Sequence, residues 1–147
     1  MTEQPTDTEL ADRYSRKRAR MMPALTVIFL TQQAAYLSDA PAGRAVDQVR
    51  IGAWAVLATV LLLLLVTGGA WIRPRAIRAL MDDEVTRANR ASALNLGFTL
   101  AIGMGIGLFV LAPVLDLTAR QAIHFIVSIG LASALLRFGL QERRALG

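Results

Sequence analysis

The stretch SALNLGFTLAIGMGIGLFVLAPVLDLTARQAIHFIVSIGLASALL, residues 92–136, contains two long apolar runs with almost nothing between them. The runs cover about 92–115 and 119–137, and only the tripeptide 116–118, Asp-Leu-Thr, separates them. Each run is close to the roughly 20 apolar residues that a helix needs to cross a bilayer. Because a link this short forces two helices to run antiparallel, the stretch predicts a transmembrane helical hairpin.

Two further apolar segments lie upstream, at about 21–37 and 51–72. With the hairpin they predict an all-α fold: an integral membrane four-helix bundle over residues 21–140. The alternative for the first segment is a cleaved secretory signal peptide. The tail before it is long and contains acidic residues, and Pro41 adjoins the only small-residue cleavage candidate, so we expect the segment to remain as a span.

The positions of the basic residues predict the orientation. Of the 16 Lys and Arg residues, 13 fall in the tail 1–20, the loop 73–91 or the C-terminal end. The other side of the predicted bundle has only Arg44, Arg50 and Arg120. Since cytoplasmic loops carry the excess of Lys and Arg, we expect both termini and the loop 73–91 in the cytoplasm. The net charge of +5 then marks sidedness.

Helix-start signals occur on the predicted cytoplasmic side and in the hairpin link. Thr6 and Glu9 match a capping box in the tail 1–20, so a short helix is expected near Asp7. The later part of this tail is polybasic and suits anionic lipid. The third helix is expected to begin near Asp82 or Asp83. In the link, Asp116 or Thr118 is expected to cap the fourth helix. Residues 141–147 form a short cytoplasmic C-terminal tail.

The composition excludes much chemistry. Hydrophobic residues make up 54% of the 147 residues and charged residues 18%, which does not suit a soluble globular enzyme. The absence of cysteine excludes disulfides and thiolate chemistry, and a single histidine excludes a two-histidine metal site within one subunit. With no P-loop, dinucleotide fingerprint or protease motif, we expect no catalytic residues, cofactor or metal.

Small residues on the third span predict close helix packing, since helices in lipid associate through close backbone approach. One ridge recurs every four residues, and a GxxxG pair lies on another face; their members are Ala93, Gly97, Ala101 and Gly105, and Gly103 and Gly107. One ridge is expected to meet the fourth span. The second leaves open a homo-oligomer interface.

Polar residues within the spans form a second candidate site, near the predicted external surface. They are Gln32, Gln33, Tyr36, His124 and Ser128. Intramembrane polar groups often mark function, so a small-molecule or ion-sensing site is one interpretation. Interhelical hydrogen bonding is the other. Because glutamine cannot exchange a proton, a proton-coupled exporter with an acid in its first span is not expected.

The loop 73–91 holds the candidate docking surface for a partner. Apolar residues at helical spacing accompany an acidic run and two arginines that favour ion pairs along a helix. The candidate residues are Asp82, Asp83, Glu84, Arg87, Asn89 and Arg90. Direct nucleic-acid binding is not expected, because no DNA-binding fold fits in the tail 1–20.

Three motifs in the second half, DDEVTRANR (82–90), RQAIHFIVSIG (120–130) and ALLRFGLQERR (134–144), resemble a group of small, largely uncharacterised bacterial membrane proteins with four predicted spans. Members of that group are often associated with a compact helix-turn-helix regulator of the Cro/repressor type. The resemblance implies a partner in the bacterial cytoplasmic (inner) membrane that tethers or restrains such a regulator. It implies no catalytic residue.

The sequence therefore favours a non-enzymatic, multi-pass regulatory or sensory protein that binds a small cytoplasmic protein, with the lipid bilayer as its other partner. The alternative is a small transporter or channel. Four spans enclose little space alone, so this alternative requires a homo-oligomer.

Overall fold

The computed structural model describes residues 6–38, 44–69 and 79–145; the side chains of 34–38, 44 and 45 are not described. Within these ranges the chain forms no strand and four long helices, which confirms the all-α prediction. The helices are α1 (Asp7–Ser38), α2 (Arg44–Val66), α4 (Glu84–Leu111) and α5 (Ala119–Ala145).

Three of these helices are long and apolar enough to cross a membrane. They are α2 over Val46–Val66, α4 and α5, with mean hydropathies of 2.4, 2.0 and 1.8. The remaining long helix, α1, is not among them. Gln32 and Gln33 lower the hydropathy of its apolar half, and its first two turns are charged.

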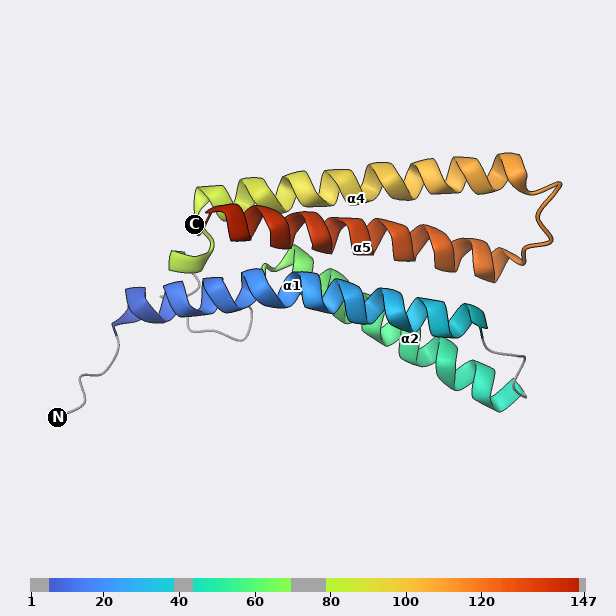
Figure 1. Cartoon of the computed structure of the whole chain (residues 1–147), viewed down its shortest axis with the longest axis horizontal. Coiled ribbons are helices and arrows are strands. Elements are labelled where there is room, and N and C mark those ends of the chain that lie inside the picture. Colours follow the sequence, from blue (N-terminus) through green and yellow to red (C-terminus); the bar gives the residue numbers. More distant parts are fainter. Residues whose placement is uncertain (1–5, 39–43, 70–78, 146–147) are drawn as a thin grey trace.

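α5 is the central helix of the bundle (Figure 1). It runs antiparallel to α4, packs along α1 on another side, and makes smaller contacts with α2. In the 18-residue apolar stretch of α5, half of the residues are buried, whereas in that of α4 only 6% are. We call the end that carries the link 112–118 the hairpin end, and the end where α1 begins and α5 ends the terminal end.

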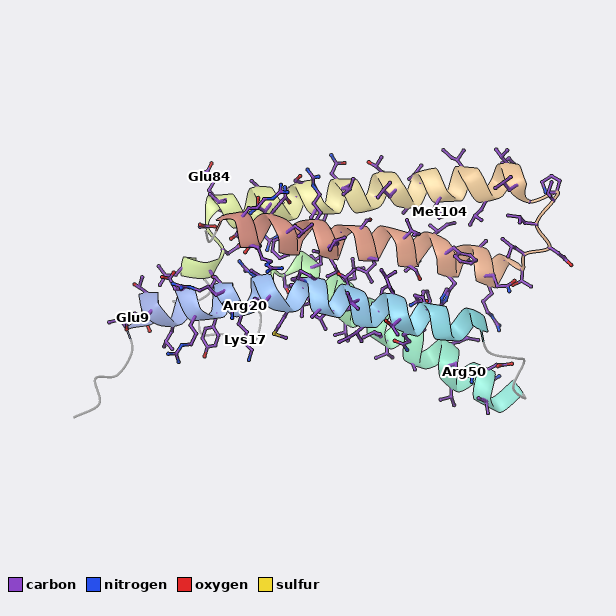
Figure 2. All side chains as sticks on the ribbon, viewed as in Figure 1. Glu9, Lys17, Arg20, Arg50, Glu84 and Met104 are labelled. Atoms are coloured by element: carbon purple, nitrogen blue, oxygen red, sulfur yellow. The ribbon has the colours of Figure 1, made fainter. Side chains whose placement is uncertain are left out.

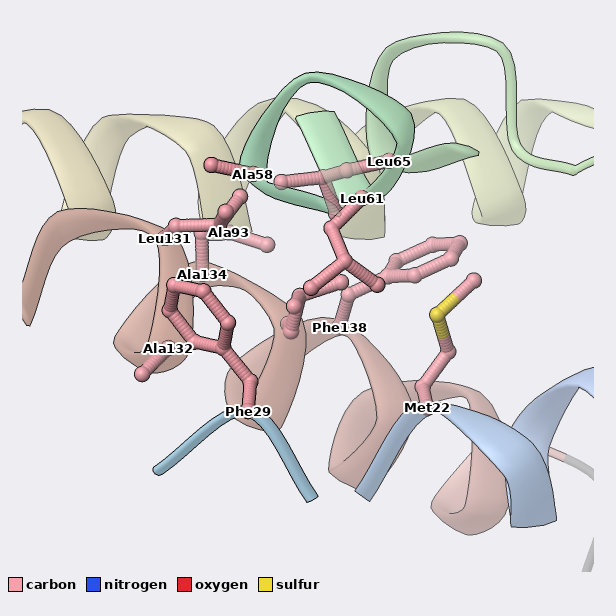
Figure 3. Packing of buried hydrophobic residues seen from close by; sticks show 11 residues of the cluster. Met22, Phe29, Ala58, Leu61, Leu65, Ala93, Leu131, Ala132, Ala134 and Phe138 are labelled. Atoms are coloured by element: carbon pink, nitrogen blue, oxygen red, sulfur yellow. The ribbon is translucent and has the colours of Figure 1, made fainter. Parts of the chain in front are cut away.

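The hydrophobic core contains residues of all four long helices, with α5 at its centre (Figure 3). Its buried residues are Met22, Phe29, Ala58, Leu61, Leu65, Ala93, Leu131, Ala132, Ala134, Leu135 and Phe138. Phe29, Leu65, Leu135 and Phe138 have no exposed surface. Burying such a side chain contributes about 1.5–3 kcal/mol in water. Inside a bilayer the gain comes from packing instead, since lipid tails are as apolar as leucine.

α4 and α5 approach so closely at Gly97 that no larger residue fits. A Cβ atom on Gly97 would lie 2.5 Å from the carbonyl oxygen of Gly130 and 2.7 Å from the Cβ of Ala134. Ala93 is fully buried on the same ridge, and Gly105 faces Ile126. This ridge therefore forms the hairpin interface.

The second ridge of α4 points away from the described bundle. A Cβ atom on Gly103 or Gly107 would meet nothing within 4 Å. This face of α4 is open to its surroundings.

Reciprocal caps stabilise the starts of two helices. The amide of Thr6 donates to the carboxylate of Glu9 at 2.9 Å, and the amide of Glu9 donates to the hydroxyl of Thr6 at 3.4 Å. At α5 the amide of Thr118 donates to the side-chain oxygen of Gln121, whose own amide donates back to the Thr118 hydroxyl. Both arrangements satisfy amides that a helix start leaves without partners.

Several helix boundaries differ from the predicted spans: α2 begins earlier, at Arg44, α4 ends at Leu111, and α5 continues to Ala145. α1 is one continuous helix of 32 residues, so the N-terminal tail and the first apolar segment are a single element. α2 ends at Val66 rather than near residue 72. Gly68 and Gly69 adopt φ angles of +66° and +70° after it, a left-handed backbone that glycine tolerates and that commonly ends helices.

Candidate functional site

Arg18 is the centre of a buried polar network that joins α1, α4, α5 and the turn after α2 at the terminal end. Its side chain, on α1, forms an ion pair with the carboxylate of Glu142 on α5. It also donates to the carbonyl of Gly68 after α2 at 3.2 Å and to the hydroxyl of Thr86 on α4 at 3.3 Å. The guanidinium lies 5.5 Å from the centre of the Phe138 ring. One cation on α1 thus contacts α4, α5 and the turn that follows α2.

Both charged side chains of the ion pair are buried, and other polar groups of the protein surround them. Arg18 is 7% exposed and Glu142 is 3% exposed, so both charges depend on protein partners. The second oxygen of Glu142 accepts from the side-chain amide of Asn89 at 3.2 Å. The carbonyl of Gly68 follows the C-terminal end of α2, and a cation near such an end is favourable.

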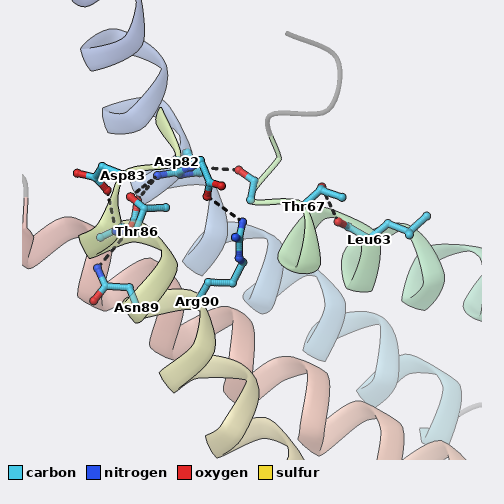
Figure 4. Close-up of polar contacts among 10 residues, drawn as sticks. Leu63, Thr67, Asp82, Asp83, Thr86, Asn89 and Arg90 are labelled. Carbon is cyan, nitrogen blue, oxygen red and sulfur yellow. Dashed lines mark hydrogen bonds and ion pairs between the residues drawn. The ribbon is translucent and has the colours of Figure 1, made fainter. Parts of the chain in front are cut away.

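The predicted docking residues separate into two groups (Figure 4). Asn89 binds Glu142, and Arg90 pairs with Asp82 at 3.2 Å, so these three are partly buried and already have partners within the described chain. Asp83 is the N-cap of α4, because its carboxylate accepts from the amide of Thr86 at 2.7 Å. The side chains of Asp83, Glu84 and Arg87 are exposed.

Exposed charges at the terminal end are ordered along the bundle (Figure 2). Along α1 the acids precede the bases, and at the start of α4 Asp83 and Glu84 precede Arg87; these acids, which we call the acidic tip, are Asp7, Glu9, Asp12, Asp83 and Glu84. Exposed bases follow, in a basic band of Arg13, Arg16, Lys17, Arg20, Arg87, Arg143 and Arg144. Contact between Ala11 and Met81 packs the beginning of α1 against the segment before α4. The two halves of the acidic tip therefore lie at one end of the molecule.

The hairpin-end half of the bundle buries a second set of polar groups. The α1–α5 register is fixed by Arg18 with Glu142, and by Pro23 against Gly139. Continued along both helices, this register places Gln33 level with Ser128. Both are buried, and neither side chain has a hydrogen-bond partner among the described residues.

Other members of the predicted polar cluster are placed differently. His124, one turn from Ser128, is buried and stacks on Trp54 of α2 with ring centres 4.7 Å apart. Gln32 is exposed and does not join the buried set, because it faces away from α5. The side chain of Tyr36 lies outside the described residues.

Sequence reasoning did not identify the Arg18 network. Arg18 was expected to act with the other tail cations on anionic lipid, and Glu142 was not singled out. In RKRAR and QERR nothing local distinguishes the buried charge from its exposed neighbours. A weak signal exists in hindsight, since Arg18, Met22 and Phe29 recur at helical spacing on one face of α1.

In comparisons with known proteins, no family model matches the chain, and no curated sequence or solved structure matches it either. The resemblance to the four-span bacterial proteins therefore stays a prediction.

Proposed function

We propose that this chain is a non-enzymatic regulatory protein of a bacterial cytoplasmic membrane, and that it binds a small cytoplasmic helix-turn-helix regulator through its acidic tip. The order of charges at the terminal end carries this proposal. A basic band next to the apolar segments suits anionic headgroups. The acidic tip then extends beyond the headgroups, where it is available to a basic protein surface.

We include a membrane crossing by α1 in the proposal. α1 lies along α5 at matching depth, with Pro23 against Gly139 and Phe29 in one cluster with Ala132. If α5 crosses the bilayer, the apolar half of α1 occupies the same layer. Its outward residues Val27, Ile28 and Leu30 are exposed and apolar, as a lipid-facing surface requires.

The chain is convenient for testing this topology because it contains no cysteine. The single substitutions Asp116→Cys and Ala145→Cys are expected to label oppositely with a membrane-impermeant maleimide. The Asp116→Cys variant is expected to label in intact cells, and the Ala145→Cys variant only in inverted vesicles. Equal labelling of both variants from one side contradicts the proposed orientation.

The docking proposal is tested by binding of a purified helix-turn-helix regulator of the Cro/repressor type. The double variant Asp12→Asn with Glu84→Gln removes two exposed acids without touching the N-cap. We expect it to weaken binding about tenfold or more, as loss of charge pairs worth about 1.4 kcal/mol would. The control is Asp116→Asn, an exposed acid at the hairpin end. Unchanged binding in the double variant overturns the docking site.

A second candidate function is an oligomeric channel or transporter. The open face at Gly103 and Gly107 favours contact between subunits, and the buried amide of Gln33 offers a polar group at depth. Flux of ions or small polar solutes into vesicles that contain the protein is then expected to depend on Gln33 or His124. Protein-containing vesicles that admit these solutes no faster than empty ones contradict the channel or transporter.

A further inference from the structure

Two cavities lie on either side of Trp54. The larger, about 450 Å³, lies between α2, α4 and α5 and is lined almost wholly by apolar residues such as Leu62, Phe98 and Val127. The smaller, about 310 Å³, lies nearer the hairpin end between α2 and α5. Trp54 lines both cavities.

Helical spacing shows that the two cavities follow one another along the same faces of α2 and α5, with Trp54 lining both; we call this line of cavities the furrow. The lining residues follow one another every three or four positions along a single stripe of each helix. They are Ile51, Trp54, Ala58 and Leu62 on α2, and Arg120, Ile123, Val127, Gly130 and Ala134 on α5. Residues at this spacing share a helix face. The furrow therefore runs from the hairpin end toward the middle of the bundle.

The chemistry of the lining changes along the furrow. Its inner part offers small and apolar side chains with Thr59 as the one polar residue named in its lining, whereas Arg120 provides a cation at the mouth. Trp54, stacked on His124, lies between these parts. An apolar slot with a cation at headgroup depth is complementary to an anionic amphiphile.

We propose that the furrow binds an anionic phospholipid, with one acyl chain in the apolar part and the phosphate at Arg120. Its volume lies in the range of ligand pockets, about 300–1,000 Å³. A helix about 10 Å across and 20 Å long occupies on the order of 1,500 Å³, so the furrow suits an acyl chain better than a partner helix. The inference rests on the membrane location proposed above, but not on the cytoplasmic regulator.

Fluorescence quenching by brominated lipid tests the proposal. Replacing Trp71 by Phe leaves Trp54 as the only tryptophan. In this background the protein is placed in phosphatidylcholine vesicles that contain either brominated phosphatidylglycerol or brominated phosphatidylcholine with the same acyl chains. We expect about fivefold tighter association of phosphatidylglycerol, the factor that corresponds to about 1 kcal/mol for one arginine near an anionic surface.

Two variants separate the headgroup site from the acyl slot. Arg120→Gln is expected to abolish the preference for phosphatidylglycerol, whereas Arg144→Gln, an exposed arginine at the terminal end, is expected to keep it. Ala55→Phe fills the slot and is expected to reduce quenching by both lipids. Ala53→Phe, exposed on α2 but outside the slot, is its control.

The outcomes distinguish this proposal from the membrane location itself. Absence of quenching by any brominated lipid contradicts the membrane location. Equal quenching by both headgroups, or quenching that Ala55→Phe does not reduce, overturns the lipid site alone. A second copy of the chain in the furrow would give weak quenching with both lipids, and the quenching would rise as the protein is diluted in the bilayer. That result also overturns the lipid site.

Discussion

At the terminal end α1, α4, α5 and the turn after α2 each contribute a group to one connected network around Arg18, whereas nearer the hairpin end Gln33 and Ser128 are buried with no hydrogen-bond partner among the described residues. The first set holds a charge whose two terminal nitrogens have exchanged water for protein partners, while Nε of Arg18 has no hydrogen-bond partner among the described residues. The second holds neutral groups that lost water without such compensation. A satisfied polar network specifies one arrangement of the helices, while an unsatisfied one costs free energy and leaves hydrogen-bonding capacity for another molecule.

The largest expected effect comes from removing the counter-charge of Arg18. Glu142→Ala leaves a buried guanidinium without its carboxylate, and we expect the free energy of unfolding to fall by about 3–5 kcal/mol. The measurement is unfolding in mixed micelles followed by helical circular dichroism. Arg143→Ala, an exposed neighbour, is the control.

The double variant Arg18→Met with Glu142→Leu tests the same pair more sharply. Apolar replacements of both partners are expected to restore most of the lost stability, since a buried ion pair is often close to neutral against an apolar pair of similar size. A double variant as unstable as Glu142→Ala would show that the loss comes from other contacts of Glu142.

The next largest loss of stability is expected from a steric clash in the α4–α5 hairpin, between the terminal end and the hairpin end. Gly97→Ala is expected to destabilise the hairpin by about 1–3 kcal/mol, because the new Cβ atom lies within 2.7 Å of both Gly130 and Ala134. Gly103→Ala, which meets nothing within 4 Å, is the matched control. Unfolding in mixed micelles measures both, and equal effects would contradict the packing at Gly97.

Removing a helix cap is expected to lower stability less than the substitution at Gly97, and by a similar amount at both ends of the bundle. Asp83→Ala removes the cap of α4 at the terminal end, and Thr118→Ala removes that of α5 at the hairpin end. Each is expected to cost about 1 kcal/mol in the same unfolding measurement, since each leaves a helix amide without its acceptor. A much larger cost at Asp83 alone would mean that the cap also positions Thr86 in the Arg18 network.

The smallest effect has the opposite sign. Gln33→Leu replaces an uncompensated buried amide by an apolar side chain of similar size, and we expect a gain of about 0.5–1 kcal/mol. Gln32→Leu, on the exposed side of α1, is expected to change stability little. A loss of stability in Gln33→Leu, again read from micelle unfolding, would show that the amide is in fact satisfied.

Much of the helical framework follows from local sequence. The apolar runs of α4 and α5 and the cap at Thr118 depend on residues within a few positions of one another, and these features match the structure. The link is longer than the predicted tripeptide 116–118, because α4 ends at Leu111 and residues 112–118 join the two helices. The end of α2 was misjudged. Apolar residues continue in the sequence past Gly68 and Gly69 to residue 72, but the left-handed backbone of these two glycines ends the helix before them.

The candidate sites were harder to predict, because exposure depends on which helix face meets α5. Asn89 and Glu84 both belong to the acidic and polar run before the third span, yet Asn89 binds Glu142 and Glu84 is exposed. Which of the two side chains is exposed depends on the rotation of α4 about its axis. That rotation follows from contacts with residues such as Glu142, more than 50 residues away in the chain.

The sequence by itself determined the helical fold, the hairpin and the sides of the bundle on which charges gather, because each of these arises from short-range spacing and composition. Only the tertiary structure decided that Arg18, among five cations in its tail, is the buried one. It also brought Arg120, Trp54 and the apolar stripe of α5 together along one furrow. Both depend on helix register and rotation, which are set by the fit of Gly97, Gly130 and Gly139 against distant neighbours.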